Sequence, residues 1–224
     1  MAIKKISNIH NEWLKLIEIS GPFLSIKILS DVFPQGLNTL DNPEIRRTLK
    51  TAYNEFQDNK KELQLSWIKY ILEEILRYSE DDSILIEGQE IPERLRVYRP
   101  GQFEVIIPNF VIKNPDSPNE ERMLVKYYPV GYKLDSASKT SSGISPIDSM
   151  IELCRATGVK LGLVTNGDIW VLVHAPLGET STFATWYANL WLEEPETLRA
   201  FMNLLDVQRF FGVAEKDKLE NLFS

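Results

Sequence analysis

Two short apolar segments end in residue types from which a site for phosphodiester hydrolysis could be built. They read Val105-Ile106-Ile107-Pro108-Asn109 and Met123-Leu124-Val125-Lys126. Such a site needs two carboxylates that hold a divalent cation through oxygen ligands, and a lysine that helps to orient or activate the attacking water. On this interpretation the site positions are Asn109, Leu124 and Lys126, which must converge at one edge of a common sheet.

Both positions that require a carboxylate are neutral. Asn109 stands where an aspartate is needed and Leu124 where a second acidic residue is needed, which leaves Lys126 alone. An amide and an alkyl chain cannot offset the charge of a divalent metal, and the lysine would add repulsion. We therefore expect no bound metal and no cleavage from this frame. The simpler alternative is that the three residues are strand ends of an unrelated sheet.

Other acidic residues near the two segments could replace the missing ligands. The candidates are Glu87, Glu104, Asp116 and Glu121. With them the chain would be an active DNA endonuclease, and Mg²⁺ would be its cofactor. Asp116 and Glu121 lie in a polar, turn-like stretch only a few residues apart, which disfavours this alternative.

The charge and composition restrict the classes of partner. A net charge of −7 over 224 residues is the wrong sign for a domain that grips DNA by its own phosphate contacts. Lys126, Lys133 and Lys139 are nevertheless candidates for a local DNA-binding face, with a solvated loop as the alternative. The single cysteine, Cys154, and the lack of any long apolar stretch indicate a cytoplasmic protein that does not enter a membrane.

The elements that must position these residues fall into two parts. Residues 1–80 predict a helical prefix, because apolar residues recur at helical spacing and Asn42 or Asp41 before Pro43 resembles a helix start. Residues 81–224 predict a mixed β-sheet flanked by helices, an α+β or α/β fold. The expected helices are two that meet at Gly21-Pro22, then 43–59, 63–78, 146–158, 194–205 and 216–222. The expected strands are 84–86, 103–112, 122–128, 159–164, 168–174 and 183–187, with an exposed serine-rich loop at 135–145.

The segment Leu163-Val164-Thr165-Asn166-Gly167-Asp168-Ile169-Trp170-Val171-Leu172-Val173 predicts a β-hairpin with a primed two-residue turn at Asn166-Gly167. Together with 183–188, 209–213 and the Val32-Phe33-Pro34-Gln35-Gly36-Leu37 segment, it resembles the region that precedes the methyltransferase in large adenine-specific DNA methyltransferases. These belong to phage-defence systems of the DISARM type and to type IIG restriction-modification systems. The resemblance implies a restriction-nuclease-like fold of the PD-(D/E)xK type.

The same resemblance implies which neighbouring domain, cofactor and partners the chain should have. The methyltransferase, with its Asn-Pro-Pro-Tyr motif and its S-adenosylmethionine, is expected only in a downstream domain, so this chain is interpreted as a fragment without a cofactor of its own. Its expected partners are DNA, contacted through the full-length protein, and other subunits of a defence system. We expect a scaffold or a DNA- or partner-positioning module.

A protein-interaction module is the remaining hypothesis. It requires exposed apolar residues on helices 43–59 or 63–78, whereas burial of both apolar stripes argues against it. The tryptophans Trp170, Trp186 and Trp191 are interpreted as core residues. His10, near an expected exposed start, and His174 have no nucleophile pattern beside them, so no catalytic role is expected for either.

Overall fold

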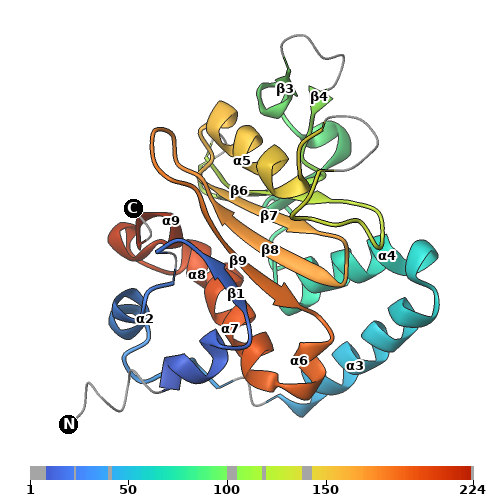
Figure 1. Ribbon diagram of the computed structural model, residues 1–224, viewed down its shortest axis with the longest axis vertical. Helices are drawn as coiled ribbons and strands as arrows, with labels where there is room; N and C mark the ends of the chain where they lie inside the picture. The colour runs from blue at the N-terminus through green and yellow to red at the C-terminus, as the bar shows by residue number, and fades with distance from the viewer. Residues whose placement is uncertain are drawn as a thin grey trace.

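The computed structural model describes residues 9–22, 24–39, 42–99, 105–117, 120–137 and 143–222. They form the expected mixed sheet with helices on both faces, which has seven strands, and beside it a small two-stranded sheet that was not predicted (Figure 1). The order in the large sheet is β1 (Glu18–Ser20), β9 (Thr182–Tyr187), β8 (Ile169–His174), β7 (Leu161–Thr165), β6 (Glu121–Tyr127), β5 (Phe110–Lys113) and β2 (Leu85–Glu87). Among the strands of the described residues, only β6 and β7 pair in parallel. The small sheet joins β3 (Val97–Tyr98) to β4 (Val105–Ile106).

Helix α5 (Pro146–Thr157) covers one face of the sheet, and most of the other helices cover the opposite face (Figure 1). The latter are α2 (Ile26–Val32), α3 (Pro43–Asp58), α4 (Lys60–Tyr70), its π-helical extension (Ile71–Ile75), α6 (Leu190–Glu193), α7 (Pro195–Leu205), α8 (Val207–Phe211) and α9 (Leu219–Leu222). Three 3₁₀ turns lie at Gly88–Glu90, Glu93–Leu95 and Glu215–Asp217, and residues 9–14 are helical. None of the helices in the described ranges is long and apolar enough to cross a membrane.

Local sequence explains why α5 begins and ends where it does. The Ser145 hydroxyl accepts a hydrogen bond from the Asp148 backbone N–H at 3.0 Å, and Pro146 occupies the first turn. Gly158 ends the helix with a φ of 80°, which glycine adopts without strain. Gly162 lets α5 pack closely on β7. A Cβ at this position would lie only 2.4 Å from Met150 Cγ.

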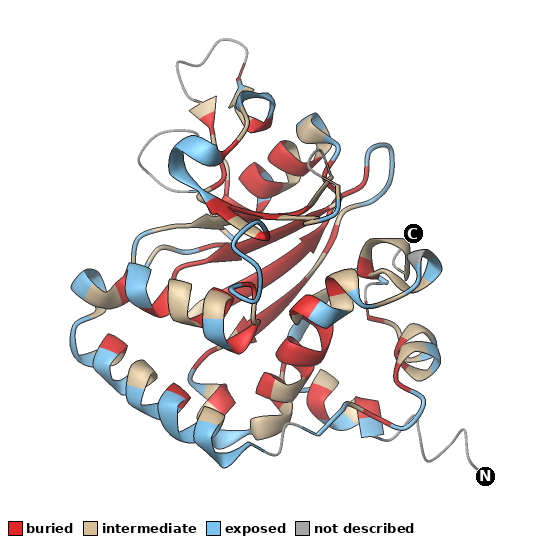
Figure 2. Cartoon of the chain, turned by 180° about the vertical axis from the view of Figure 1, so that it is seen from behind, coloured by how far each residue is buried: buried red, intermediate tan, exposed pale blue. Residues whose placement is uncertain are grey.

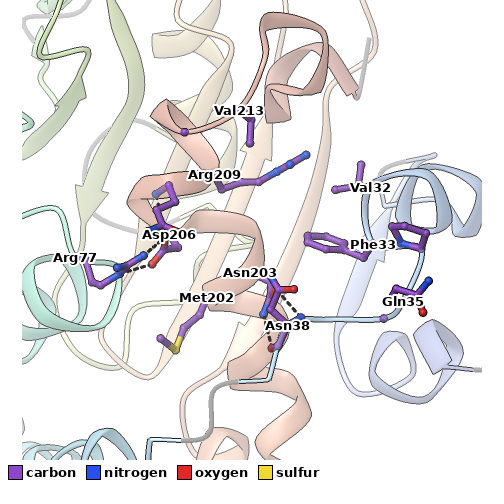
Figure 3. Close-up of a pocket in the computed structure, with 14 residues that line it drawn as sticks. Val32, Phe33, Gln35, Asn38, Arg77, Met202, Asn203, Asp206, Arg209 and Val213 are labelled. Atoms are coloured by element: carbon purple, nitrogen blue, oxygen red, sulfur yellow. Dashed lines mark hydrogen bonds and ion pairs between the residues drawn. The ribbon is translucent and has the colours of Figure 1, made fainter.

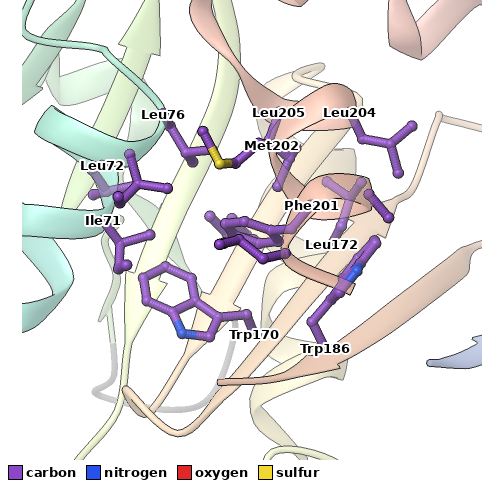
Figure 4. Close-up of a cluster of buried hydrophobic side chains, with 14 of the residues drawn as sticks. Ile71, Leu72, Leu76, Trp170, Leu172, Trp186, Phe201, Met202, Leu204 and Leu205 are labelled. Carbon is purple, nitrogen blue, oxygen red and sulfur yellow. The ribbon is translucent and has the colours of Figure 1, made fainter. Parts of the chain in front are cut away.

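Two hydrophobic clusters fill the spaces on either side of the sheet. The larger cluster is rich in aromatic side chains, and Trp170, Trp186 and Phe201 are fully buried in it (Figure 4). The smaller cluster lies between the sheet and α5 and includes Leu124 and Met150. The sheet is therefore buried on both faces, while the outer surface of α3 is exposed (Figure 2). The three tryptophans that we expected in the core are there.

The β7–β8 turn anchors the prefix to the sheet. Gln64 Nε2 donates to the Asn166 carbonyl at 2.7 Å, Trp67 Nε1 donates to the Gly167 carbonyl at 2.8 Å, and Lys60 pairs with Asp168 at 2.8 Å. The turn type was predicted wrongly. Gly167 has a positive φ of 94° and Asn166 does not, because the Asn166 side chain instead accepts from the N–H groups of residues 168 and 169.

The helical prefix also needs correction, because it contributes a strand. β1 pairs antiparallel with β9 at the edge of the sheet, so Gly21-Pro22 joins a strand to α2 and is not an elbow between two helices. His10 is fully buried, contrary to the expected exposed start: its Nε2 donates to the Phe33 carbonyl at 3.1 Å. Its Nδ1 accepts from Trp13 Nε1 at 3.3 Å.

The strand expected from Phe103 to Ile112 is divided. Val105–Ile106 belongs to the small sheet and Phe110–Lys113 to the large one. Pro108 lies between them and has no N–H with which to continue a strand ladder. Phe103 lies outside the described residues.

Candidate functional site

Asn109 and Lys126 lie side by side at one end of the β5–β6 pair. The Asn109 backbone N–H donates to the Val125 carbonyl at 2.7 Å, and its side-chain Oδ1 accepts from the Tyr127 N–H at 3.0 Å. Lys126 Nζ donates to the Ile107 carbonyl at 2.7 Å. The segments that carry the sequence pattern are thus neighbours, and the polar side chains at this end bind backbone groups of the partner segment.

Leu124 occupies the third position and is fully buried. It lies opposite Val111 of β5 and packs in the cluster beneath α5. Leu124 and Lys126 are two residues apart on β6, so their side chains leave the strand on the same face. The arrangement offers one ammonium group, one amide oxygen and an alkyl surface, which is not a ligand set for Mg²⁺.

The three alternative acidic candidates that lie in the described ranges do not gather around Lys126. Glu87 lies opposite Phe110 on the other sheet face and pairs with Lys69 at 2.5 Å. Asp116 is exposed in the β5–β6 turn. Glu121 pairs with Arg94 at 2.6 Å.

Strand geometry separates the turn from Lys126. Glu121 precedes Lys126 by five positions on β6, which corresponds to about 16 Å at the usual rise per residue. The described residues contain no group of three or more histidine, cysteine, aspartate or glutamate side chains that could hold a metal ion. Glu104 lies outside the described residues.

Two of the three lysines proposed for DNA contact, Lys126 and Lys133, lie in the described ranges. Lys126 is half-buried and lies over the Tyr128 ring at 5.7 Å, whereas Lys133 is exposed on the loop after β6. Lys139 falls outside the residues that the structure describes.

Lys133 instead lines a cavity of about 440 Å³ beside β8, β9 and β1. Glu18, Asp135 and Asp168 also line this cavity, so its wall carries three carboxylates and one lysine. Tyr187 donates to Glu18 at 2.6 Å, and burial followed by this carboxylate raises the pKa of the tyrosine to about 12. An acidic wall is unsuited to a DNA phosphate.

A larger cavity of about 530 Å³ was not anticipated from the sequence. We call it the Arg209 cavity; it lies between the chain segment after α2 and helices α7 and α8 (Figure 3). Its lining residues are Val32, Phe33, Pro34, Gln35, Gly36, Asn38, Arg77, Met202, Asn203, Asp206, Gln208, Arg209, Gly212 and Val213. Two of the segments that carry the sequence resemblance, 32–37 and 209–213, meet here, which is the only sequence signal that could have pointed to it.

His174 and Cys154, two further residues of reactive type, are buried. Burial lowers the pKa of His174, and burial raises the pKa of the Cys154 thiol to about 12. A thiol with so high a pKa is not a nucleophile at neutral pH.

Comparison with known proteins adds no relative. No family model, curated protein or solved structure matches the chain. The interpretation therefore rests on the geometry of the described residues and on the sequence resemblance.

Proposed function

We propose that the chain is a nuclease-like domain without cleavage activity of its own, which acts as a scaffold in a DNA-modifying protein of a phage-defence or restriction-modification system. The observation that carries this proposal is the pairing of Asn109 with β6 beside Lys126, because a metal-dependent nuclease needs carboxylates at the positions of Asn109 and Leu124. The frame of two adjacent strands is present and the ligands are absent from it.

The strand arrangement supports a relationship to restriction nucleases. β5 and β6 form an antiparallel pair, and α5 then crosses over to β7, which runs parallel to β6. The hairpin of β7 and β8, whose sequence carries much of the resemblance, lies in the buried centre of the sheet. A PD-(D/E)xK-type domain is the finer fold that we propose for this arrangement.

The position of the charges supports the absence of cleavage. Glu87 is engaged by Lys69 on the other sheet face, and Glu121 is engaged by Arg94 about 16 Å from Lys126. A magnesium ion needs several oxygen ligands at about 2.1 Å from one centre, which these side chains do not supply.

A scaffold role also accounts for the charge of −7. DNA contact then belongs to the full-length protein, together with the adenine methyltransferase and its S-adenosylmethionine, and other defence subunits are the expected protein partners. A docking role for the prefix helices has less support. Among the large apolar residues of α3 and α4, Leu65 alone is strongly exposed, at 42%, and the rest of both stripes is buried or half-buried.

Incubation of the purified chain with supercoiled plasmid and either Mg²⁺ or Mn²⁺ tests the proposal. We expect the plasmid to stay intact, and calorimetric titration to detect no divalent-ion binding. Cleavage by the wild-type chain that is lost in Lys126→Ala would contradict the proposal and favour the active endonuclease.

A gain-of-function variant tests the frame itself. Asn109→Asp with Leu124→Glu puts both carboxylates back beside Lys126. Mn²⁺ should then raise the midpoint of thermal unfolding, because a ligand that binds only the folded state stabilises it. The matched control is Asn109→Asp with Met123→Glu, which buries an equivalent carboxylate one residue away on the opposite sheet face. An equal response of the two double variants to Mn²⁺ would show that the frame has no nuclease geometry.

A further inference from the structure

Two arginines line the Arg209 cavity, Arg77 and Arg209, and their guanidinium groups differ in hydrogen bonding. Arg77 Nε donates to Asp206 Oδ2 at 2.7 Å and Arg77 Nη2 donates to Asp206 Oδ1 at 2.6 Å. This is the two-point contact that a guanidinium makes with a carboxylate or a phosphate. Arg77 is held by this contact even though its backbone has a φ of 60°, in the left-handed region that favours glycine.

Arg209 presents the same pair of nitrogens without an acceptor. Its Nε and Nη2 are shielded from water, and neither has a hydrogen-bond partner among the described residues. The guanidinium lies over the Phe33 ring, with 5.7 Å between Cζ and the ring centroid (Figure 3). Burial lowers the pKa of this group, and the Asp217 and Glu220 carboxylates act against that effect from a distance.

A buried donor that lacks an acceptor is costly, because water no longer satisfies it and the protein does not replace the water. Nη1 is not among the shielded atoms, so it is the nitrogen that an entering acceptor meets first. A rotation of the side chain toward that acceptor would then bring Nη2 or Nε into the contact.

The charges on the wall favour an anion. Arg77 and Arg209 contribute two positive charges and Asp206 one negative charge, which leaves an excess of one positive charge in a chain whose net charge is −7. Because Arg77 pairs with Asp206, the lining of the cavity holds no second carboxylate for Arg209, and Asp217 and Glu220 act on its charge only from a distance. Gln35 and Gln208 add amide groups to the wall.

The size of the cavity favours a small molecule. Its volume of about 530 Å³ falls within the range of ligand pockets and exceeds that of a bare oxyanion. Phe33, Met202 and Val213 provide apolar wall for the rest of such a molecule. We propose that the Arg209 cavity binds a small organic anion, whose carboxylate or phosphate group accepts hydrogen bonds from the Arg209 guanidinium.

This site is independent of the nuclease-like frame. Arg209 and its cavity belong to the helices on one face of the sheet, whereas Leu124 and Lys126 lie on the α5 face. The absence of plasmid cleavage, or its presence, does not affect the inference.

Two probes, inorganic phosphate and citrate, test the inference and distinguish the two anion chemistries. Each is titrated against the full chain to about 20 mM, above the millimolar Kd typical of a weak ligand, with sodium chloride at matched ionic strength as the blank. At ten times its Kd, a probe should raise the ratio of folded to unfolded protein about tenfold. The ¹H–¹⁵N signal of Arg209 Nε should move while that of Arg77 Nε stays in place.

Arg209→Met should abolish the response, and Arg209→Lys should weaken it because an ammonium lacks the planar pair of donors. The matched control is Arg47→Met, which removes the same charge from an exposed side chain and should respond as the wild type does. Neither probe acting on the wild type, or equal responses of the wild type and Arg209→Met, would overturn the inference. Binding of a short DNA duplex that depends on Arg209 would also overturn it, because the site would then be a nucleic-acid contact.

Discussion

The two ends of the β5–β6 pair differ in a way that bears directly on function. The Asn109 end carries a lysine and an amide, and both bind backbone groups. The turn end carries the carboxylates: Asp116 is exposed, Glu120 binds Asn114 at 2.9 Å, and Glu121 pairs with Arg94 at 2.6 Å. A cation-dependent hydrolase needs the lysine and the carboxylates together, and this hairpin holds them apart.

The comparison shows that two strands can carry part of a catalytic sequence pattern without forming the metal site that the pattern usually serves. At the Asn109 end, the asparagine side chain continues the strand ladder by accepting the Tyr127 N–H at 3.0 Å. A leucine at 124 then strengthens the packing under α5. Both residues are therefore explained by stability.

If the Asn109 end is structural, truncation of Leu124 should have the largest effect on the free energy of unfolding. Leu124→Ala removes a fully buried side chain beneath α5 and should lower the free energy of unfolding by about 3 kcal/mol, from lost burial and the cavity that remains. Urea titration measures the change. Leu177→Ala makes the same truncation at a side chain that is 77% exposed, and it should stay within about 0.5 kcal/mol of the wild type. Similar losses at both positions would contradict the packing role.

A smaller loss of stability is expected when Asn109 is replaced. Asn109→Ala removes the acceptor for the Tyr127 N–H and should lower the free energy of unfolding by about 1.5 kcal/mol, because a half-buried donor loses its partner. Hydrogen exchange of the Tyr127 amide should accelerate with it. Asn189→Ala, at an exposed position whose side chain does not cap α6, should leave the free energy of unfolding nearly unchanged. If the Tyr127 amide stays protected from exchange in Asn109→Ala, the Asn109 side chain does not stabilise this end of the strand pair.

Much of the fold follows from local signals. The bounds of α5 follow from Ser145-Pro146 and Gly158, and the β7–β8 hairpin follows from two apolar segments on either side of Asn166-Gly167. β1 could not be predicted in this way, because it has only three residues and forms by pairing with β9, which follows more than 160 residues later.

The same contrast applies to the sites. The meeting of Asn109 and Lys126 could be anticipated because their segments form neighbouring strands. The Arg209 cavity combines the segment after α2, Arg77 and helices α7 and α8, so only tertiary packing brings its wall together. Whether the Arg209 guanidinium finds a hydrogen-bond acceptor depends on the groups that tertiary packing places nearby. Sequence spacing does not predict those groups.

At the turn end, the negative charge of Glu121 can be removed without a change in side-chain volume. Glu121→Gln keeps the side-chain volume and cancels the ion pair with Arg94, so the free energy of unfolding should fall by about 0.7 kcal/mol, within the range for partly exposed pairs. Denaturant titration of Glu121→Gln beside Glu55→Gln, an exposed residue of α3, isolates the pair. If Glu121 were a metal ligand instead, the wild type would gain stability from Mg²⁺ and Glu121→Gln would not.

The smallest effect depends on pH and concerns Glu120. The hydrogen bond from Asn114, followed by the charges of Lys218 and Arg122, lowers the pKa of Glu120 in the folded chain. A lowered folded pKa stabilises the protein above the unfolded pKa of about 4.3, and this contribution is lost as the pH falls through the folded value. Because 41% of the side chain is exposed, the contribution should be only about 0.3 kcal/mol.

Glu120→Gln isolates this contribution, because a protonated glutamate and a glutamine carry the same charge. The wild type should be more stable than Glu120→Gln at pH 7, and the difference should vanish near pH 3 and shrink in high salt. The same pair of titrations on Asn109→Asp reports the other end of the hairpin, where the new carboxylate lies beside Lys126. A wild-type advantage over Glu120→Gln that persists at pH 3 would mean that Glu120 acts through packing, and the turn end would then not be held by charge.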